Sequence, residues 1–188
     1  YLDISQRHFT ALARLIDNLF DLSAMTAGVL RLLKKQFNLS ELMHEIVDRF
    51  CTMDTAVACD MQIEKGIFAL GDKLRFEQVV TNLLSNALKY GKGNPIKVGL
   101  RQDGDVAELT FVDKGIGISV EKQKTIFEKF ERLSSDNNGL GLGLYITRQI
   151  ITAHGGTIEV KSTPGEGSTF IVRWPLHSES HGFLRLVG

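Results

Sequence analysis

The sequence predicts an α+β protein, in which helices and β-hairpins follow one another along 188 residues. Apolar residues recur at helical spacing in several segments, and two pairs of segments alternate between apolar and polar residues, as half-buried strands do. Each of those two pairs is joined by a turn that contains glycine, and this combination predicts hairpins. Hydrophobic residues make up 43% of the chain, so a protein of this length can bury a core.

Opposite charges balance in this chain, which has 22 Lys and Arg against 22 Asp and Glu. A net charge of zero argues against a dedicated nucleic-acid binder and against a polybasic membrane-surface module. No apolar run approaches the ~20 residues of a membrane helix, and no signal-peptide pattern begins the sequence. The two cysteines, Cys51 and Cys59, have neither CxxC nor metal-ligand spacing, and we predict reduced thiols.

Five segments are predicted to be helical. Residues 1–35 form one long helix, whose apolar stripe needs a partner that we expect outside the chain. The capping-box pattern at residues 38–41 begins a helix that ends near Phe50, and Asp72 caps a third helix that runs to Tyr90. Residues 120–127 and 141–153 form the last two helices, and the two glycines after His154 are typical of a helix end.

Three hairpins are predicted from the alternating segments. Residues 59–70 alternate weakly and give a short hairpin. Residues 96–100 and 107–112 form the second hairpin around the Asp-Gly turn at residues 103–104. Residues 157–161 and 168–174 form the third hairpin, and no clear pattern follows Pro175.

Polar residues share one face of the helix predicted at residues 72–90. Asn82 and Asn86 are four residues apart, and Lys89 and Tyr90 lie one turn further on. Asparagine is a poor residue for the middle of a helix, so the two amides suggest neutral oxygen ligands for a Mg²⁺ that phosphates already hold. Lys89 would then supply a point charge for phosphate. A solvated polar face explains the same pattern equally well.

Two glycine-rich segments lie further along the chain. Asp113 ends a strand and can accept a hydrogen bond from an exocyclic amine, while Gly115 and Gly117 let a ligand approach the backbone; an ordinary tight turn is the alternative. Residues 139–144 open a helix, whose N-terminal amides can bind phosphate. A Rossmann turn is excluded because a polar loop precedes these residues, and the sequence contains no P-loop.

Taken in order, these segments resemble the sequence boxes of the histidine protein kinases of two-component signalling. This family lies within the ATPase and kinase superfamily that includes gyrase, Hsp90 and MutL. The N box resembles residues 82–90, the G1 box residues 113–117, the F box residues 126–130 and the G2 box residues 139–144. The turn at residues 154–156 and the strand at residues 167–170 also match, and the likeness covers residues 3–176.

The resemblance implies a two-layer α/β sandwich, in which helices cover one face of a mixed, mostly antiparallel sheet and bind ATP and Mg²⁺. It assigns these residues to the ATP site: Asn82, Asn86, Lys89, Tyr90, Asp113, Gly115, Ile116, Gly117, Phe130, Gly139, Leu140, Gly141, Leu142, Gly143, Leu144 and Thr169. The glycines at 139–143 would hinge a lid formed by residues 129–140.

The resemblance also implies a role for each polar residue of the site. Asn86 binds Mg²⁺, with Asn82 close to the metal or the phosphates, and Lys89 and Tyr90 contact phosphate and ribose. Asp113 recognises the adenine amine, helped by Thr169 through a water molecule.

Asn82 and Lys89 are the candidate catalytic residues. ATP-hydrolysing members of the superfamily have a glutamate base where this sequence has Asn82. Because an amide cannot take the proton of the attacking water, Asn82 favours phosphotransfer over hydrolysis.

A histidine kinase phosphorylates a histidine in an H box, and none of the five histidines of this sequence lies in one. Residues 1–35 therefore resemble the second helix of a dimerisation hairpin without a phosphoacceptor, residues 36–176 the catalytic domain, and residues 177–188 an unassigned tail. The sequence is either a fragment or a protein that lacks the acceptor.

Three functions remain for the chain as a whole. The first is the ATP-binding half of a sensor histidine kinase; the others are an ATP-hydrolysing machine and a degenerate scaffold that signals by binding. The first implies an acceptor hairpin of the same protein or its dimer mate, a response-regulator receiver domain, a homodimer at full length and no nucleic acid. It also implies a cytoplasmic domain, whose parent protein can be anchored in the bacterial inner membrane.

Overall fold

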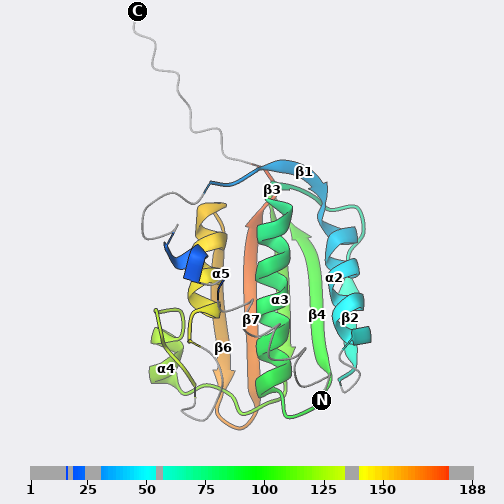
Figure 1. The fold of residues 1–188 in the computed structure, drawn as a ribbon. Helices are drawn as coiled ribbons and strands as arrows, with labels where there is room; N and C mark the ends of the chain where they lie inside the picture. The colour runs from blue at the N-terminus through cyan, green and yellow to red at the C-terminus, as the bar shows by residue number, and fades with distance from the viewer. Residues whose placement is uncertain (1–15, 17–18, 24–30, 54–56, 134–139, 178–188) are drawn as a thin grey trace, which may run out of the picture.

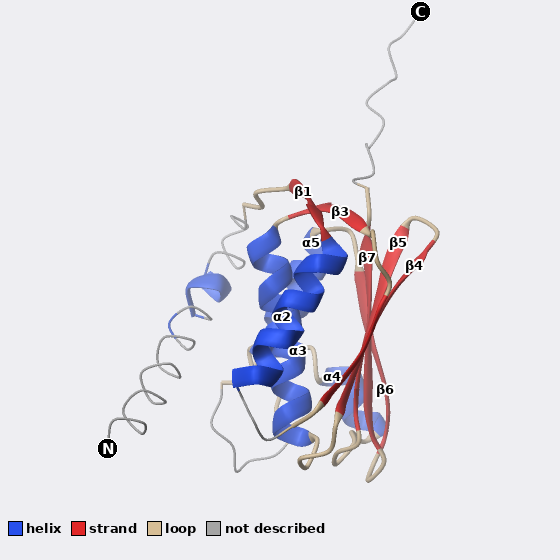
Figure 2. Ribbon diagram, turned by 90° about the vertical axis from the view of Figure 1, so that its right-hand side faces the viewer, coloured by secondary structure: helices blue, strands red, loops and turns tan. Residues whose placement is uncertain are grey.

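The computed structural model of the chain describes residues 16, 19–23, 31–53, 57–133 and 140–177, which form a two-layer α/β sandwich (Figure 1). Seen edge-on, the large sheet has the helices packed on one of its two faces (Figure 2). The fold class predicted from the sequence is therefore confirmed. None of the helices in the described part of the chain combines the length and apolarity needed to cross a bilayer.

The large sheet has five strands in the order β2-β4-β5-β7-β6. Strand β2 is parallel to β4, and the other three pairs are antiparallel. The strands span Cys59–Ile63 (β2), Ile96–Asp103 (β4), Val106–Asp113 (β5), Thr157–Thr163 (β6) and Gly167–Pro175 (β7). Both hairpins predicted from residues 96–112 and 157–174 are confirmed, because β4 pairs with β5 and β6 pairs with β7.

The helices that cover the sheet begin and end close to their predicted positions. They span Leu39–Met53 (α2), Lys73–Tyr90 (α3), Val120–Thr125 (α4) and Gly143–Ala153 (α5). The Asn38 side chain accepts a hydrogen bond from the Glu41 N–H at 3.1 Å, and this bond gives α2 the N-terminal cap expected from the sequence.

The weakly alternating residues 59–70 do not form a hairpin, so that prediction was wrong. Strand β2 instead joins the edge of the large sheet, next to β4. The strand β3 (Phe68–Gly71) pairs with β1 (Lys35–Asn38) in a separate two-stranded ribbon. Alternation shows that a segment has two unlike faces, but it does not identify the partner strand.

The prediction of reduced thiols was also wrong, because Cys51 and Cys59 form a disulfide. Cys51 lies near the end of α2, and Cys59 begins β2. The chain reverses direction between these elements and brings the two Cα atoms to 6.3 Å, a separation that a disulfide can span. The separation of eight residues between the two cysteines does not by itself reveal that the chain reverses direction.

Most of the long helix predicted over residues 1–35 lies outside the described residues. Ile16 and residues 19–23 are helical, but residues 31–34 have no regular structure and Lys35 begins β1, so the helix ends earlier than predicted. The buried Asp21 accepts hydrogen bonds from Arg75 and Gln78 on α3, each at 2.6 Å. The described part of this segment is thus tied to the central helix of the domain.

Helix α3 lies at the centre of the helical layer and has one wholly apolar face. The side chains on this face are Phe76, Val79, Val80, Leu83, Leu84 and Ala87. Phe76 contacts Trp174 of β7 edge-on, with ring centroids 5.2 Å apart. The Asp72 carboxylate caps the helix, accepting hydrogen bonds from the N–H groups of Leu74 at 3.1 Å and Arg75 at 3.2 Å. This packing fixes which side of α3 is left for polar residues.

His154, at the C-terminal end of α5, is a buried link between that helix and the start of α3. Its Nε2 accepts a hydrogen bond from the Asp72 N–H at 3.0 Å, and its Nδ1 lies 2.8 Å from the Ile150 carbonyl oxygen. Its ring also packs on Trp174, with centroids 4.3 Å apart. Burial lowers the pKa of His154 from its ordinary value of 6.5, and the nearby Lys34 charge lowers it further.

We expect His154 to make the stability of the fold fall on acidification. Because its folded pKa lies below 6.5, its contribution is present in full above about pH 7 and is lost as the pH falls through the lowered value. Urea unfolding, followed by the fluorescence of the single Trp174, should give a smaller free energy of unfolding at pH 5.5 than at pH 7.5.

His154→Leu should flatten this pH dependence. It should also cost about 1–3 kcal/mol at pH 7.5, because the buried Asp72 N–H loses its acceptor. The exposed His44 provides the control, and His44→Asn should keep the slope of the wild-type chain. An unchanged slope in His154→Leu would contradict the assignment.

Candidate functional site

A pocket opens near the C-terminal end of α3, between that helix, the turn after β5, the strand β7 and the start of α5. Ten residues line it: Asn86, Tyr90, Asp113, Ile116, Gly117, Ile118, Leu133, Leu144, Ser168 and Phe170. Six of them are residues that the sequence assigned to the site: Asn86, Tyr90, Asp113, Ile116, Gly117 and Leu144. Three segments that are far apart in the sequence thus meet in one place.

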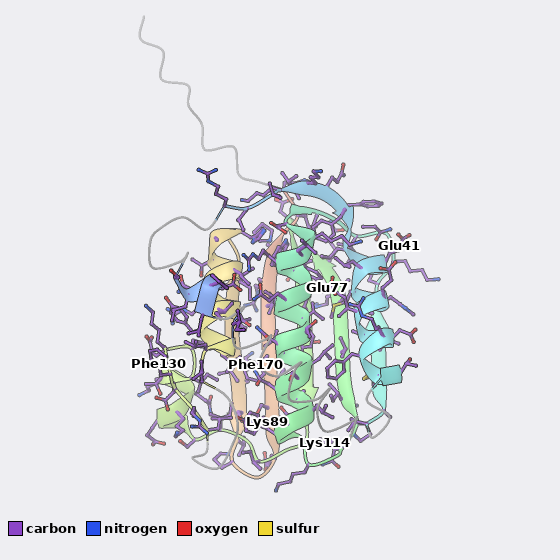
Figure 3. All side chains as sticks on the ribbon, in the orientation of Figure 1. Glu41, Glu77, Lys89, Lys114, Phe130 and Phe170 are labelled. Carbon is purple, nitrogen blue, oxygen red and sulfur yellow. A yellow bond between two sulfur atoms is a disulfide. The ribbon has the colours of Figure 1, made fainter. Side chains whose placement is uncertain are left out.

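Helix α3 brings Asn86 and Tyr90 to the pocket because residues four apart share a helix face. Lys89 is exposed beside them, and its Nζ lies 5.0 Å from the centre of the Tyr90 ring, a cation–π distance. Figure 3 shows Lys89 near the lower end of α3 and Phe170 on β7. An amide, a phenol and an ammonium group therefore stand at this end of the helix.

Asn82 lies one turn earlier on α3 and is not among the residues that line the pocket. Its amide nitrogen is 3.5 Å from the Gly143 carbonyl oxygen and 3.4 Å from the Thr147 hydroxyl, at the long end of hydrogen bonding. Gly143 and Thr147 belong to the first part of α5. Asn82 thus ties the central helix to the start of α5 and keeps its amide oxygen for another donor or a metal ion.

Asp113 ends β5 with a buried carboxylate that several donors surround. Its Oδ1 accepts a hydrogen bond from the Gly115 N–H at 2.9 Å, and Ser168 donates from both its backbone N–H and its hydroxyl. Burial raises the pKa of Asp113 above its ordinary value of 3.8, while these three hydrogen bonds act in the opposite direction. The ionised carboxylate accepts hydrogen bonds only, so this position suits a ligand that donates one.

The turn after Asp113 requires glycine at two positions. A Cβ on Gly115 would lie 1.9 Å from the Tyr90 carbonyl oxygen, and one on Gly117, which has a φ of +66°, would lie 2.0 Å from the Thr163 carbonyl oxygen. Ile116, between them, donates its N–H to Tyr90 at 3.1 Å. The close packing of this turn thus fixes one wall of the pocket against the end of α3.

The second glycine-rich segment leads into α5. Gly141 has a φ of +69°, and a Cβ there would meet the backbone of Phe130 and Glu131 at 2.7 Å. The exposed Phe130 donates its N–H to the Gly141 carbonyl at 3.1 Å. Of the neighbouring leucines, Leu140 is exposed, Leu142 is buried and Leu144 lines the pocket.

No side chain caps the start of α5, where Gly143 is the first helical residue. Nothing would meet a Cβ on Gly143 within 4 Å, so its surroundings are open. Gly139 lies outside the described residues, as do residues 134–138 of the predicted lid. The uncapped N-terminus of α5 can bind an anion through its backbone N–H groups.

The register of the sheet places Ser168, and not Thr169, beside Asp113. Asp113 pairs with Ser168, whereas Thr169 pairs with Val112. Phe170 and Trp174 of β7 contact Phe127 and Phe76 on the helical side of the sheet, so Ser168 shares that side with them. Thr169 therefore faces away from the pocket.

Four lining residues were absent from the predicted site: Ile118, Leu133, Ser168 and Phe170. The alternation of β7 contained a signal for two of them, because Ser168 and Phe170 are two residues apart on one face of a strand. Ile118 and Leu133 lie in irregular segments, where no periodicity indicates the direction in which a side chain points.

Comparison with known proteins identifies relatives for most of the chain. Residues 71–178 match the family model described as "Histidine kinase-, DNA gyrase B-, and HSP90-like ATPase". The chain is 33% identical over 174 residues to the circadian input-output histidine kinase CikA of Synechococcus elongatus, a match that covers 87% of this chain and 23% of that protein. The chain spans only 19% to 28% of the length of the first curated relatives that it matches.

Two solved structures share the fold. The histidine kinase AdeS of Acinetobacter baumannii has a TM-score of 0.76 and 24% identity, over 94% of this chain and 84% of that chain. Full-length ShkA in complex with AMPPNP has a TM-score of 0.76 and 21% identity, over 89% of this chain and 36% of that chain. At these identities the likeness establishes the architecture.

We expect Gly117→Ala to destabilise the fold much more than Gly104→Ala. Gly104 has a similar φ of +60° but nothing within 4 Å of a new Cβ, so its substitution should cost only about 1–2 kcal/mol for the left-handed backbone. Gly117→Ala adds a clash with the fixed backbone of Thr163 and should cost about 3 kcal/mol or more. Urea unfolding of both variants measures the difference, and equal losses would contradict the close packing of this turn.

Proposed function

This chain belongs to the family of histidine kinase-, DNA gyrase B- and HSP90-like ATPases, as the ATP-binding domain of the sensor histidine kinase type, and we propose that it transfers the γ-phosphate of ATP to a histidine. The acceptor histidine would stand on a hairpin helix outside this sequence, and a response-regulator aspartate would receive the phosphate next. The observation that carries the proposal is the meeting of Asp113, Asn86 and Tyr90 in one pocket near the start of α5.

Asp113 would recognise the base of the nucleotide. Its carboxylate accepts hydrogen bonds, and the exocyclic amine of adenine donates them, whereas guanine presents a carbonyl oxygen in the same place. The apolar side chains of the pocket would contact the two faces of the ring: Ile116, Ile118, Leu133, Leu144 and Phe170. Ser168, which donates to Asp113, would take the supporting role first assigned to Thr169.

The amide oxygen of Asn86 fits a Mg²⁺ ion only when phosphates supply most of the ligands. Within the described ranges, no group of three His, Cys, Asp or Glu side chains is placed to hold a metal ion by itself. A single neutral amide in the pocket matches the way Mg²⁺ binds beside nucleotide phosphates. Asn86 would hold the ion, with the amide oxygen of Asn82 as a second candidate ligand.

Backbone amides and cations would bind the phosphates. The uncapped start of α5 offers N–H groups, and Gly143 leaves the backbone open there. Lys89, at the same end of α3 as Tyr90, would neutralise phosphate charge, while Tyr90 contacts the ribose. Residues 129–140 would form a lid hinged at the glycines.

Positioning and charge neutralisation are the main requirements of phosphoryl transfer, and bound Mg²⁺·ATP would supply the transferable phosphoryl group. The side chains supplied by this domain would orient the γ-phosphate and exclude water. The amide nitrogen of Asn82 lies near α5, and an amide has no basic site that could deprotonate water. This chemistry favours transfer over the alternative of an ATP-hydrolysing machine.

The partners of the whole protein follow from the same proposal. They are an acceptor hairpin of the same protein or its dimer mate, a response-regulator receiver domain and a second copy of the full-length protein. The catalytic domain would act in the cytoplasm. A degenerate scaffold that signals by binding remains the alternative function.

We expect the chain to bind a non-hydrolysable ATP analogue in a Mg²⁺-dependent manner in a calorimetric titration. Asn86→Ala should abolish the Mg²⁺ dependence because the metal loses its protein ligand. Asp113→Asn should weaken binding at least about tenfold because the adenine amine loses a charged acceptor. Ser85→Ala, on α3 but not among the lining residues, is the control and should bind as the wild-type chain does. No binding at millimolar analogue would favour the scaffold.

Phosphotransfer is tested with γ-labelled ATP and a separately produced acceptor hairpin from a related kinase. The expected product is an acid-labile, base-stable phosphohistidine on the hairpin, which Asn86→Ala should not form. Binding of Mg²⁺·ATP without labelling of any hairpin would argue against the kinase. Steady release of phosphate in the absence of a hairpin would favour the ATP-hydrolysing machine instead.

A further inference from the structure

Three polar side chains lie in one row across neighbouring strands beside the pocket. Asp113 of β5 pairs with Ser168 of β7, and Ser168 pairs with Ser162 of β6. Residues paired in this way project from the same face of a sheet. Ser168 is buried and lines the pocket together with Asp113, whereas Ser162 stands one strand further away.

The hydroxyl of Ser162 contacts three groups that shape the pocket. It accepts a hydrogen bond from the Ile118 N–H at 2.8 Å. Its own proton is directed at the Gly167 carbonyl oxygen, 2.6 Å away, with the Ser168 hydroxyl at 3.2 Å. Ser162 therefore contacts the peptide that precedes Ser168 and also the hydroxyl of Ser168 itself.

The direction of these hydrogen bonds is set by the number of protons. Each serine hydroxyl has one proton, and Ser168 uses its proton on the Asp113 carboxylate. Ser162 uses its proton on the nearer Gly167 carbonyl oxygen and accepts from the Ile118 N–H, so it holds Ser168 through the preceding peptide and by the 3.2 Å contact between the two hydroxyl oxygens. The Asp113 carboxylate is left as an acceptor.

Gln123 of α4 holds the outer end of this row. Its side-chain amide donates to the carbonyl oxygens of Ile118 and Ser162, both at 2.8 Å. Ile118 and Ser162, which are joined by the bond from the Ile118 N–H to the Ser162 hydroxyl, are therefore both held by the Gln123 amide. The backbone that carries the Ser162 hydroxyl is thus held against α4.

From this geometry we infer that Ser162 is a positioning residue for base recognition: it holds Ser168 in the orientation that presents Asp113 to the exocyclic amine of adenine. The inference rests on the proposed function and adds to it a residue that does not touch the nucleotide. Its effect should depend on the amine, because Ile118, the other lining residue that bonds to Ser162, stays held by the Gln123 side-chain amide.

The test compares ADP with the diphosphate of purine riboside, which lacks the exocyclic amine, by calorimetric titration in the presence of Mg²⁺. In Ser162→Ala, ADP should bind about five- to twentyfold more weakly, whereas the purine riboside diphosphate should bind within about twofold of its affinity for the wild-type chain. Ser162→Thr keeps the hydroxyl and should restore most of the affinity for ADP. Thr125→Ala removes an exposed hydroxyl of α4 that bonds only within its own helix and should change neither affinity.

The possible outcomes separate the inference from the proposed function. Equal weakening of both nucleotides in Ser162→Ala, or no weakening of either, would overturn the inference while the proposed function stands. Failure of the wild-type chain to bind either nucleotide would overturn both. Thermal unfolding of each variant shows whether a loss of affinity comes from a loss of fold, and Ser162→Thr keeps the comparison decisive if Ser162→Ala is unstable.

Discussion

The hydrogen bonds of Asp72 are the interaction on which the rest of the domain depends. Its carboxylate caps α3 and also accepts from the Leu33 N–H at 2.9 Å, while its own N–H donates to His154 at the end of α5. A single residue therefore joins the segment before β1, the central helix and the C-terminal end of α5. These bonds fix the start of α3, and the packing of its apolar face sets the rotation that decides which of its side chains reach the pocket.

The rotation of α3 gives its polar face two different roles. Asn86 and Tyr90 line the pocket, but Asn82, one turn earlier, contacts the start of α5. Two asparagines that look equivalent in the sequence thus differ in the structure: Asn86 lines the pocket, and Asn82 joins two helices. The distinction comes from α5, which packs against only part of α3, and no property of the α3 sequence alone reveals it.

Features that depend on local contacts could be predicted from the sequence, whereas features that depend on contacts between distant segments could not. The cap at Asp72, the helix that follows it and the turn at Gly104 depend on neighbouring residues, and all three were predictable. The partner of β2 and the disulfide between Cys51 and Cys59 depend on how distant segments pack, and both predictions were wrong. Within the site, the alternation of β7 could have distinguished Ser168 from Thr169, but only the register with β5 shows which of them pairs with Asp113.

That register links the Asp113 end of the pocket to helix α4. Asp113, Ser168 and Ser162 form one row across β5, β7 and β6, and Gln123 ties the row to α4. Helix α4 is also held close to Glu131, which pairs with Lys122 at 3.2 Å. A change at Glu131 that moved α4 would therefore act on Ser162 before it reached Asp113. Under the proposed function, in which residues 129–140 form a lid and Asp113 binds the base, recognition of the base and movement of the lid would then be coupled through this row of hydrogen bonds.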